Sequence, residues 1–151
     1  MKKLIFITAS LFILSKTMAQ TTASDSVKAT INHFFEGMKS GDTALIRSTL
    51  TEGVIFQTIA RSKEGALSVK TENVDDFLHS ISQLEKGNAD ERIEFKTIEI
   101  DGALTSVWTP YKFYYKGQFS HCGANSFQLV KIDGSWKIQY IIDTRKRIGC
   151  E

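Results

Sequence analysis

The sequence predicts an α+β domain in which three N-terminal helices pack on a curved antiparallel sheet and form a conical half-barrel. The first observation is an apolar stripe with helical period, made of Val27, Ile31, Phe34, Phe35 and Met38. The second is a strong hairpin signal at Asp133-Gly134, flanked on both sides by aromatic and β-branched residues. The third is the order of the elements, because helical patterns dominate the first half and long strand patterns the second.

Three helices follow from the apolar spacing and from residues that cap helix ends. The first carries the stripe and ends at a glycine, which tolerates the left-handed backbone of a helix C-terminus. In chain order, the helices are predicted from a cap at Ser24 or Asp25 to Gly41, from a cap at Asp42 to Leu50, and over residues 74–84 after a cap at Asn73 or Thr71.

The strands follow from runs of alternating apolar residues between turn signals. They are predicted over residues 54–59, 66–70, 92–100, 104–115, 119–132 and 135–142, with tight turns at Asp101-Gly102, Lys116-Gly117 and Asp133-Gly134. Pro110 lies inside the fourth of these strands. Because proline lacks an N–H, it is expected to mark an edge position or a β-bulge.

Residues 1–19 have the pattern of a secretory signal peptide, which leaves residues 20–151 as the domain. Two lysines precede an apolar run from Leu4 to Leu14, and Thr17 and Ala19 are the small residues before the expected cleavage site. A membrane anchor is the alternative, but the run is too short to span a bilayer. The sequence therefore predicts a secreted or periplasmic protein that is free of the membrane after cleavage.

Cleavage makes the domain nearly neutral. The whole chain has a formal net charge of +2, and removal of three lysines leaves 16 basic and 17 acidic residues. Bulk charge therefore gives no reason to expect binding to nucleic acid. The basic cluster Arg145-Lys146-Arg147 is interpreted as a solvated tail in preference to a phosphate site.

Cys122 and Cys150 are the only cysteines, and export would bring them into an oxidising compartment. Their spacing lacks the CxxC pattern and nearby histidines of zinc sites, so no metal is expected, and no cofactor is expected either. Cys122 as a nucleophile beside His121 is disfavoured, because adjacent strand residues point to opposite faces. We predict a disulfide that joins the C-terminal tail to the sheet.

The order of elements, the Ser40-Gly41-Asp42 junction and the stretch from Gly134 to Ile138 resemble the nuclear transport factor 2-like superfamily. Within it, residues 108–114, 119–123 and 143–145 are similar to the SnoaL-like and putative lumazine-binding group of exported bacterial proteins. The resemblance implies a conical domain with an internal ligand cavity, usually in a homodimer. The superfamily contains isomerases, dehydratases and cyclases beside binding proteins, so it does not decide the function.

The strand register predicts which side chains face the interior. Counting back from Asp133-Gly134 places Leu129 opposite Ile138 and Phe127 opposite Tyr140. A two-residue turn at Lys116-Gly117 places Trp108 opposite Asn125 and Lys112 opposite His121. The predicted ligand-binding residues are therefore Trp108, His121 and Asn125, with Phe56 and Tyr140 as apolar wall.

Each of these assignments has an alternative. An inward histidine is often a core residue with a protein partner, and Trp108 and Tyr140 also suit a core. A bulge at Pro110 would exchange the two faces of its strand. Asp143 falls on the outer face in the simple register, so a dyad with His121 is not expected.

We expect a binding domain that holds a small apolar or heteroaromatic molecule in the cone. The alternative is an isomerase, dehydratase or cyclase that uses His121 as general base and Asn125 as donor. Whether the chain catalyses a reaction is left open. The outer face carries Val130, Ile132, Ile141, Tyr111, Phe113 and Tyr115 in this register, which suggests a homodimer through that face.

Overall fold

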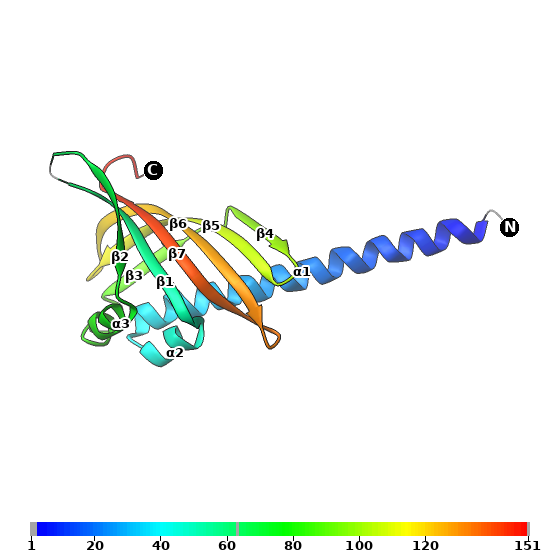
Figure 1. Ribbon diagram of the computed structural model, residues 1–151, viewed down its shortest axis with the longest axis horizontal. Coiled ribbons are helices and arrows are strands. Elements are labelled where there is room, and N and C mark those ends of the chain that lie inside the picture. Colours follow the sequence, from blue (N-terminus) through cyan, green and yellow to red (C-terminus); the bar gives the residue numbers. More distant parts are fainter. Residues whose placement is uncertain (1–2, 63, 151) are drawn as a thin grey trace.

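The computed structural model describes residues 3–62 and 64–150, with side chains described from residue 22 onward. The elements are α1 (Lys3–Ser40), α2 (Thr43–Ser48), β1 (Leu50–Arg61), β2 (Leu67–Glu72), α3 (Val74–Ser82), β3 (Ala89–Ile93), β4 (Thr97–Asp101), β5 (Leu104–Tyr115), β6 (Gln118–Ile132) and β7 (Ser135–Lys146). The helices lie along one side of a single, strongly curved sheet (Figure 1). The predicted α+β half-barrel is confirmed.

The strands form one open sheet in the order β2-β1-β7-β6-β5-β3, and β4 pairs with β5 beside β3. All neighbours are antiparallel except β1 and β7, which pair in parallel. The prediction of a wholly antiparallel sheet is therefore wrong at this one pairing. It joins distant parts of the chain, as parallel pairing requires, and no local pattern marks it.

The helix caps agree with the sequence at two positions and differ at one. Asp42 accepts a hydrogen bond from the Leu45 N–H at the start of α2, and Asn73 accepts from Asp75 and Asp76 at the start of α3. The predicted start of α1 at Ser24 or Asp25 is wrong, because the helix continues through both residues. No proline or glycine lies between residues 19 and 36 to interrupt it.

The strand predicted over residues 92–100 is two strands, β3 and β4, which both pair with β5. Pro110 lies on β5 opposite the break between them, where its carbonyl accepts from the Glu94 N–H. The N–H that proline lacks would face this same break, since both backbone groups of a strand residue point to one side. Pro110 therefore does not lie on an edge strand, but it does lie opposite a bulge-like irregularity, where residues 94–96 face only Thr109 and Pro110.

Two β-bulges change the predicted register. The turns at Lys116-Gly117 and Asp133-Gly134 form as predicted, with positive φ angles at all four residues, whereas the third turn lies one residue later than predicted, at Gly102-Ala103. Ser120 is then an extra residue in β6, so that Phe113 faces His121, Lys112 faces Cys122 and Trp108 faces Ser126. Gln139 is an extra residue in β7, so that Leu129 still faces Ile138 but Phe127 faces Ile141. The predicted pairs Trp108–Asn125, Lys112–His121 and Phe127–Tyr140 are wrong, because one inserted residue shifts every later pair.

The bulges also change which residues are buried. Tyr111 and Ile141, expected on the outer face, are buried, and so is Asp143. The core lies between the concave face of the sheet and the helices, with Ile31 and Ile46 packed towards Phe127, Leu129 and Ile138. This packing leaves the cavity at the end of the cone where α1 and α3 approach β1.

The predicted signal peptide, residues 1–19, falls outside the part of the chain whose side chains are described. Among the residues that were searched, no helix has both the length and the apolar character needed to cross a membrane. Cleavage after Ala19 and export stay predictions.

Candidate functional site

A cavity opens between the helices and the concave face of the sheet. Its apolar wall comes from α1, α3, β1, β6 and β7, and is formed by Phe34, Phe35, Met38, Phe56, Phe77, Phe127 and Ile141. Its polar wall comes from β1, β2, β3, β6 and β7, and is formed by Gln57, Glu72, Glu91, Asn125, Asp143 and Arg145. The space open to the centres of water molecules is about 80 Å³, and the cavity is open to solvent on one side.

Three aromatic rings contact one another on the helix side of the cavity. The ring centroids of Phe56 and Phe77 are 5.4 Å apart, and Phe34 lies 5.9 Å from Phe56 and 6.1 Å from Phe77. They come from a strand and two helices, so their packing depends on the tertiary fold. This cluster offers a rigid apolar surface to a flat ligand.

Glu91 and Asn125 form the polar centre of the opposite wall. The Asn125 amide, whose residue is only 5% exposed, donates to Glu91 Oε1 at 2.8 Å. Glu91 Oε2 has no hydrogen-bond partner among the described residues. Burial of the carboxyl raises the pKa of Glu91 to about 7, and the negative Asp143 adds to the increase. Near neutral pH this group can therefore accept or donate a proton.

Asp143 and Arg145 lie on the same face of β7, next to this pair. The Arg145 Nε donates to Asp143 Oδ2 at 2.8 Å, and its NH2 donates to Glu72 Oε1 at 3.1 Å. Tyr111 also donates its hydroxyl to Asp143, at 3.1 Å. Burial and the two neighbouring carboxylates raise the pKa of Tyr111, so the phenol stays protonated. Asp143 therefore accepts two hydrogen bonds, both at Oδ2, whereas Glu91 accepts one, at Oε1.

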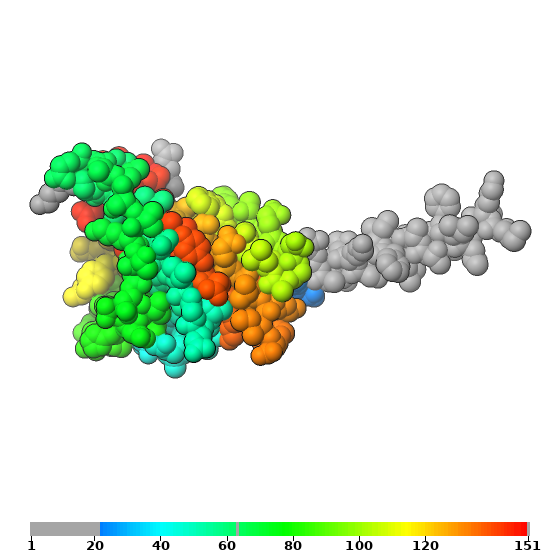
Figure 2. All heavy atoms as spheres, viewed as in Figure 1, coloured from blue at the N-terminus to red at the C-terminus, as the bar shows by residue number. Residues whose placement is uncertain are grey.

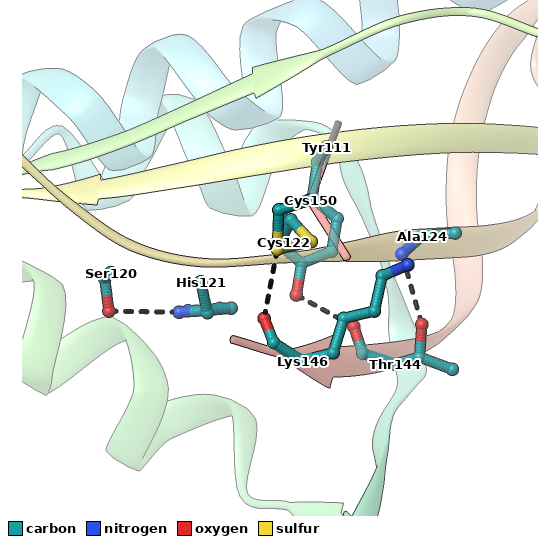
Figure 3. The surroundings of a disulfide bond; sticks show 8 residues. All are labelled: Tyr111, Ser120, His121, Cys122, Ala124, Thr144, Lys146 and Cys150. Atoms are coloured by element: carbon teal, nitrogen blue, oxygen red, sulfur yellow. Dashed lines mark hydrogen bonds between the residues drawn. A yellow bond between two sulfur atoms is a disulfide. The ribbon is translucent and has the colours of Figure 1, made fainter. Parts of the chain in front are cut away.

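Tyr111 reaches Asp143 by crossing the neighbouring strand at Gly123. Tyr111 on β5 pairs with Gly123 on β6. The Tyr111 hydroxyl also donates to the Thr144 carbonyl on β7 (Figure 3). A Cβ on Gly123 would lie 1.7 Å from that carbonyl oxygen and 2.9 Å from the Tyr111 ring. Only glycine leaves room for this close approach of three strands.

The predicted disulfide is present beside this crossing. Cys122 on β6 is bonded to Cys150, with their Cα atoms 5.7 Å apart, within the usual range (Figure 3). The bond holds the segment after β7 against the sheet. The positions of Lys146 and Arg147 are therefore fixed on both sides, by β7 and by the disulfide.

Two of the five predicted ligand-binding residues line the cavity. Phe56 belongs to the aromatic cluster and Asn125 to the polar centre. The Tyr140 hydroxyl donates to Gln57 Oε1 at 2.7 Å, and Tyr140 is not part of the lining. Ligand binding by these residues stays a proposal.

Trp108 and His121 lie elsewhere. Trp108 is 45% exposed on the face of β5 opposite to the buried Val107 and Thr109, because the bulge at Ser120 inverts the register. His121 packs against the rings of Tyr111 and Phe113 and lines a separate groove. Its partial burial and the nearby Arg145 lower its pKa. The predicted set of Trp108, His121 and Asn125 in one pocket is therefore corrected to Asn125 with Glu91.

The sequence interpretation missed Glu91, Asp143 and Arg145. Glu91 precedes the strand predicted over residues 92–100 and belonged to no predicted element, and a charged residue in such a position is ordinarily exposed. Asp143 was placed on the outer face because nothing local marks the bulge at Gln139. Asp143 and Arg145, two charged residues at alternate positions of one strand, were the available signal, but they gain meaning only once β3 and β7 flank the same cavity.

In the described part of the chain, no group of three or more histidine, cysteine, aspartate or glutamate side chains is arranged to hold a metal ion. The chemistry offered by the cavity itself is hydrogen bonding and proton transfer at Glu91, beside an aromatic surface.

Comparison with known proteins gives a family and a fold. The model of a family described as "putative lumazine-binding" matches residues 22–140. A search of curated proteins found no match.

Several solved structures share the fold at low sequence identity. An NTF2-like protein of unknown function from Shewanella baltica has a TM-score of 0.66 at 12% identity, covering 84% of this chain and 96% of its own. An NTF2-like protein of unknown function from Methylobacillus flagellatus has a TM-score of 0.64 at 16% identity, covering 83% and 94%. A protein titled putative scytalone dehydratase from Novosphingobium aromaticivorans has a TM-score of 0.65 at 13% identity, covering 87% and 89%.

Proposed function

This chain belongs to the putative lumazine-binding family, within the NTF2-like superfamily, and from this premise we propose that it is an exported domain that binds a small heteroaromatic molecule in its cavity. One observation carries the proposal. Glu91 presents an unpartnered carboxyl oxygen in a cavity whose other wall is aromatic. A flat ring with one polar edge matches these two walls.

Size limits the ligand. The cavity volume that is open to water is about 80 Å³. Pockets that hold drug-sized ligands have volumes of roughly 300–1,000 Å³, so this cavity is smaller. One ring of the ligand therefore enters between Phe56 and Glu91, and the remainder lies at the open side near Glu72 and Arg145. A ring carbonyl accepts from protonated Glu91, and a ring N–H donates to the ionised form.

A titration with a neutral aromatic probe tests this proposal. We expect 3-phenylpropionamide to shift the amide NMR signals of cavity residues, with saturation at millimolar concentration or below. Ile141→Phe fills the cavity and should weaken binding at least tenfold. Ile142→Phe, on the opposite face of the same strand, is the matched control and should bind as the wild type does. Equal binding by both variants, or no shift at cavity residues, would refute the cavity as the ligand site.

The pKa of Glu91, together with its place in the cavity, favours proton transfer as a second candidate function. A carboxyl with a pKa of about 7 suits a general base that removes a proton next to a carbonyl group. This replaces the expected His121 base, because His121 does not line the cavity. The test is deuterium exchange at the acidic C–H positions of a panel of bound cyclic ketones. Exchange that persists in Glu91→Gln would exclude Glu91 as the base.

A further inference from the structure

A second hollow adjoins the cavity and has a different character. The volume of this groove that is open to water is about 650 Å³. The groove is lined by Thr58, Ile59, Ala60, Arg61, Lys70, Glu72, His121, Arg145, Lys146 and Arg147. Glu72 and Arg145 line both the groove and the cavity. The two hollows are therefore neighbours that share one ion pair as their common wall.

The groove lies between two segments that are far apart in sequence. One wall is the end of the β1–β2 hairpin, and the other is the end of β7 with the segment after it. Figures 1 and 2 both show the tip of the hairpin, in green, beside the C-terminal residues, in red. The parallel pairing of β1 and β7 ends at Ile59 and Thr144, beyond which the strands separate.

Charge distinguishes the groove from the cavity. Five basic residues line it against a single acidic one, Glu72. Among the described residues, Lys70, Lys146 and Arg147 have no ion-pair partner. A cationic concavity of this kind attracts anions, and it does so although the domain as a whole is nearly neutral.

Arg145 has donors to spare. Its guanidinium carries five N–H bonds. The Nε–H donates to Asp143, and one N–H of NH2 donates to Glu72. The other three have no partner among the described residues. Because the side chain lines both hollows and is half exposed, these donors are available to a group at their junction.

Thr58 supplies a second, independent observation. It lines the groove and is only 8% exposed, yet its hydroxyl oxygen has no hydrogen-bond partner among the described residues. A buried hydroxyl without a partner has lost its hydrogen bonds to water and destabilises the fold. A ligand oxygen in the groove would remove this cost.

We infer that the groove binds the anionic group, a carboxylate or phosphate, of the same small molecule whose ring enters the cavity. This deepens and rests on the proposed function, and it names the ligand class as a heteroaromatic or aromatic acid. Arg145 contacts the anion at the junction, Lys146 and Arg147 add charge from the disulfide-held segment, and Thr58 donates from β1.

The experiment compares two probes that differ only in charge. We expect 3-phenylpropionate to bind at least tenfold more tightly than 3-phenylpropionamide at low ionic strength, in NMR titrations of the oxidised protein. Salt should reduce this ratio, since exposed charges are screened over about 10 Å at 0.1 M. Inorganic phosphate alone should shift signals of groove residues.

Matched variants assign the effect to the groove. The double variant Lys146→Gln/Arg147→Gln should reduce the ratio between the probes several-fold, while Arg145 keeps part of the preference. The double variant Lys86→Gln/Lys96→Gln removes the same charge from exposed sites outside both hollows, and should keep the wild-type ratio. Thr58→Val should lower phenylpropionate affinity several-fold without loss of melting temperature, because the hydroxyl has no protein partner to lose.

The outcomes separate the two proposals. Equal affinity for both probes in the wild type, with shifts in the cavity, would overturn the anion site and leave the proposed function standing. Loss of the ratio in the Lys86/Lys96 control would overturn it as well, because the effect would then be general charge. Phosphate shifts confined to the groove, with no cavity response to the neutral probe, would instead refute the proposed function and support the groove.

Discussion

At the scale of single residues, Glu91 and Asp143 are two neighbouring carboxyl groups with different surroundings. Asp143 Oδ2 accepts hydrogen bonds from the Tyr111 hydroxyl and from Arg145 Nε. Glu91 receives one, from Asn125, and lies in a mostly apolar cavity that penalises its anion. A carboxyl group whose pKa is raised by burial in a cavity, as that of Glu91 is, is common at functional sites.

The first prediction concerns pH. Because the pKa of Glu91 rises from 4.5 to about 7 on folding, the folded protein binds more protons than the unfolded chain between these values. The free energy of unfolding should therefore decrease as pH rises through this window, by about 3 kcal/mol at most. Urea unfolding of the wild type and of Glu91→Gln at a series of pH values measures the free energy of unfolding. Only the wild type should show this decrease.

The difference between the two curves isolates Glu91. Because the pKa of His121 is lowered on folding, its contribution to the free energy of unfolding rises with pH over a similar range. This contribution is the same in both proteins and cancels in the difference. Parallel curves for the wild type and Glu91→Gln would contradict the raised pKa.

The second prediction concerns Gly123. Gly123→Ala should reduce the free energy of unfolding by about 1–3 kcal/mol, because the new Cβ collides with the Thr144 carbonyl and backbone must shift. Denaturant unfolding measures the loss. Gly53→Ala is a control, since a Cβ there meets no atom within 4 Å. If Gly123→Ala loses no more free energy of unfolding than Gly53→Ala does, the close approach of β5, β6 and β7 at Gly123 is contradicted.

At the scale of elements, two inserted residues determine the site. Ser120 and Gln139 are the bulge positions in β6 and β7. Without the second, Asp143 and Arg145 would lie on the opposite face from the cavity, because strand side chains alternate with a period of two. A bulge near a functional site commonly redirects a side chain in this way.

The third prediction concerns the disulfide, whose cysteines are 28 residues apart. Cys122→Ala/Cys150→Ala should lower the free energy of unfolding by about 3–4 kcal/mol in the chain-entropy model. Because the bond also holds the segment bearing Lys146 and Arg147, the variant should lose affinity for 3-phenylpropionate more than for the neutral amide. Thiol titration of the unfolded, unreduced wild type should find no free thiol, and two free thiols would contradict the bond.

At the scale of the whole molecule, the sheet leaves apolar side chains uncovered. Leu104, Trp108 and Ile132 are each nearly half exposed, on β5 and β6. The bulges moved Tyr111 and Ile141 away from this surface, but they brought Trp108 to it. The expectation of a partner therefore stands on a different set of residues.

The fourth prediction is a homodimer through this surface. Light scattering should give twice the mass of the chain at micromolar concentration, and Trp108→Glu should give a monomer with unchanged secondary structure. Leu67→Glu, on the edge strand β2 at the far side of the sheet, is the control and should remain dimeric. A monomeric wild type, free of aggregation, would exclude the dimer.

The sequence by itself determined the elements whose cause is local. Asp42 and Asn73 cap their helices, and Lys116-Gly117 and Asp133-Gly134 form their turns, because these residue types satisfy backbone groups or adopt positive φ angles wherever they occur. Apolar periodicity then sufficed for an α+β domain with a covered sheet face. Phe56 and Asn125 were also placed at the cavity from the sequence.

Only the tertiary structure decided which polar residues share the cavity. The parallel pairing of β1 with β7, the break opposite Pro110 and the bulges at Ser120 and Gln139 depend on contacts between distant segments. One inserted residue exchanges the two faces of a strand, and its local sequence looks like any other part of that strand. For this reason Trp108 turned outward, Asp143 and Arg145 turned inward, and Glu91 met Asn125 in a place that the order of residues does not reveal.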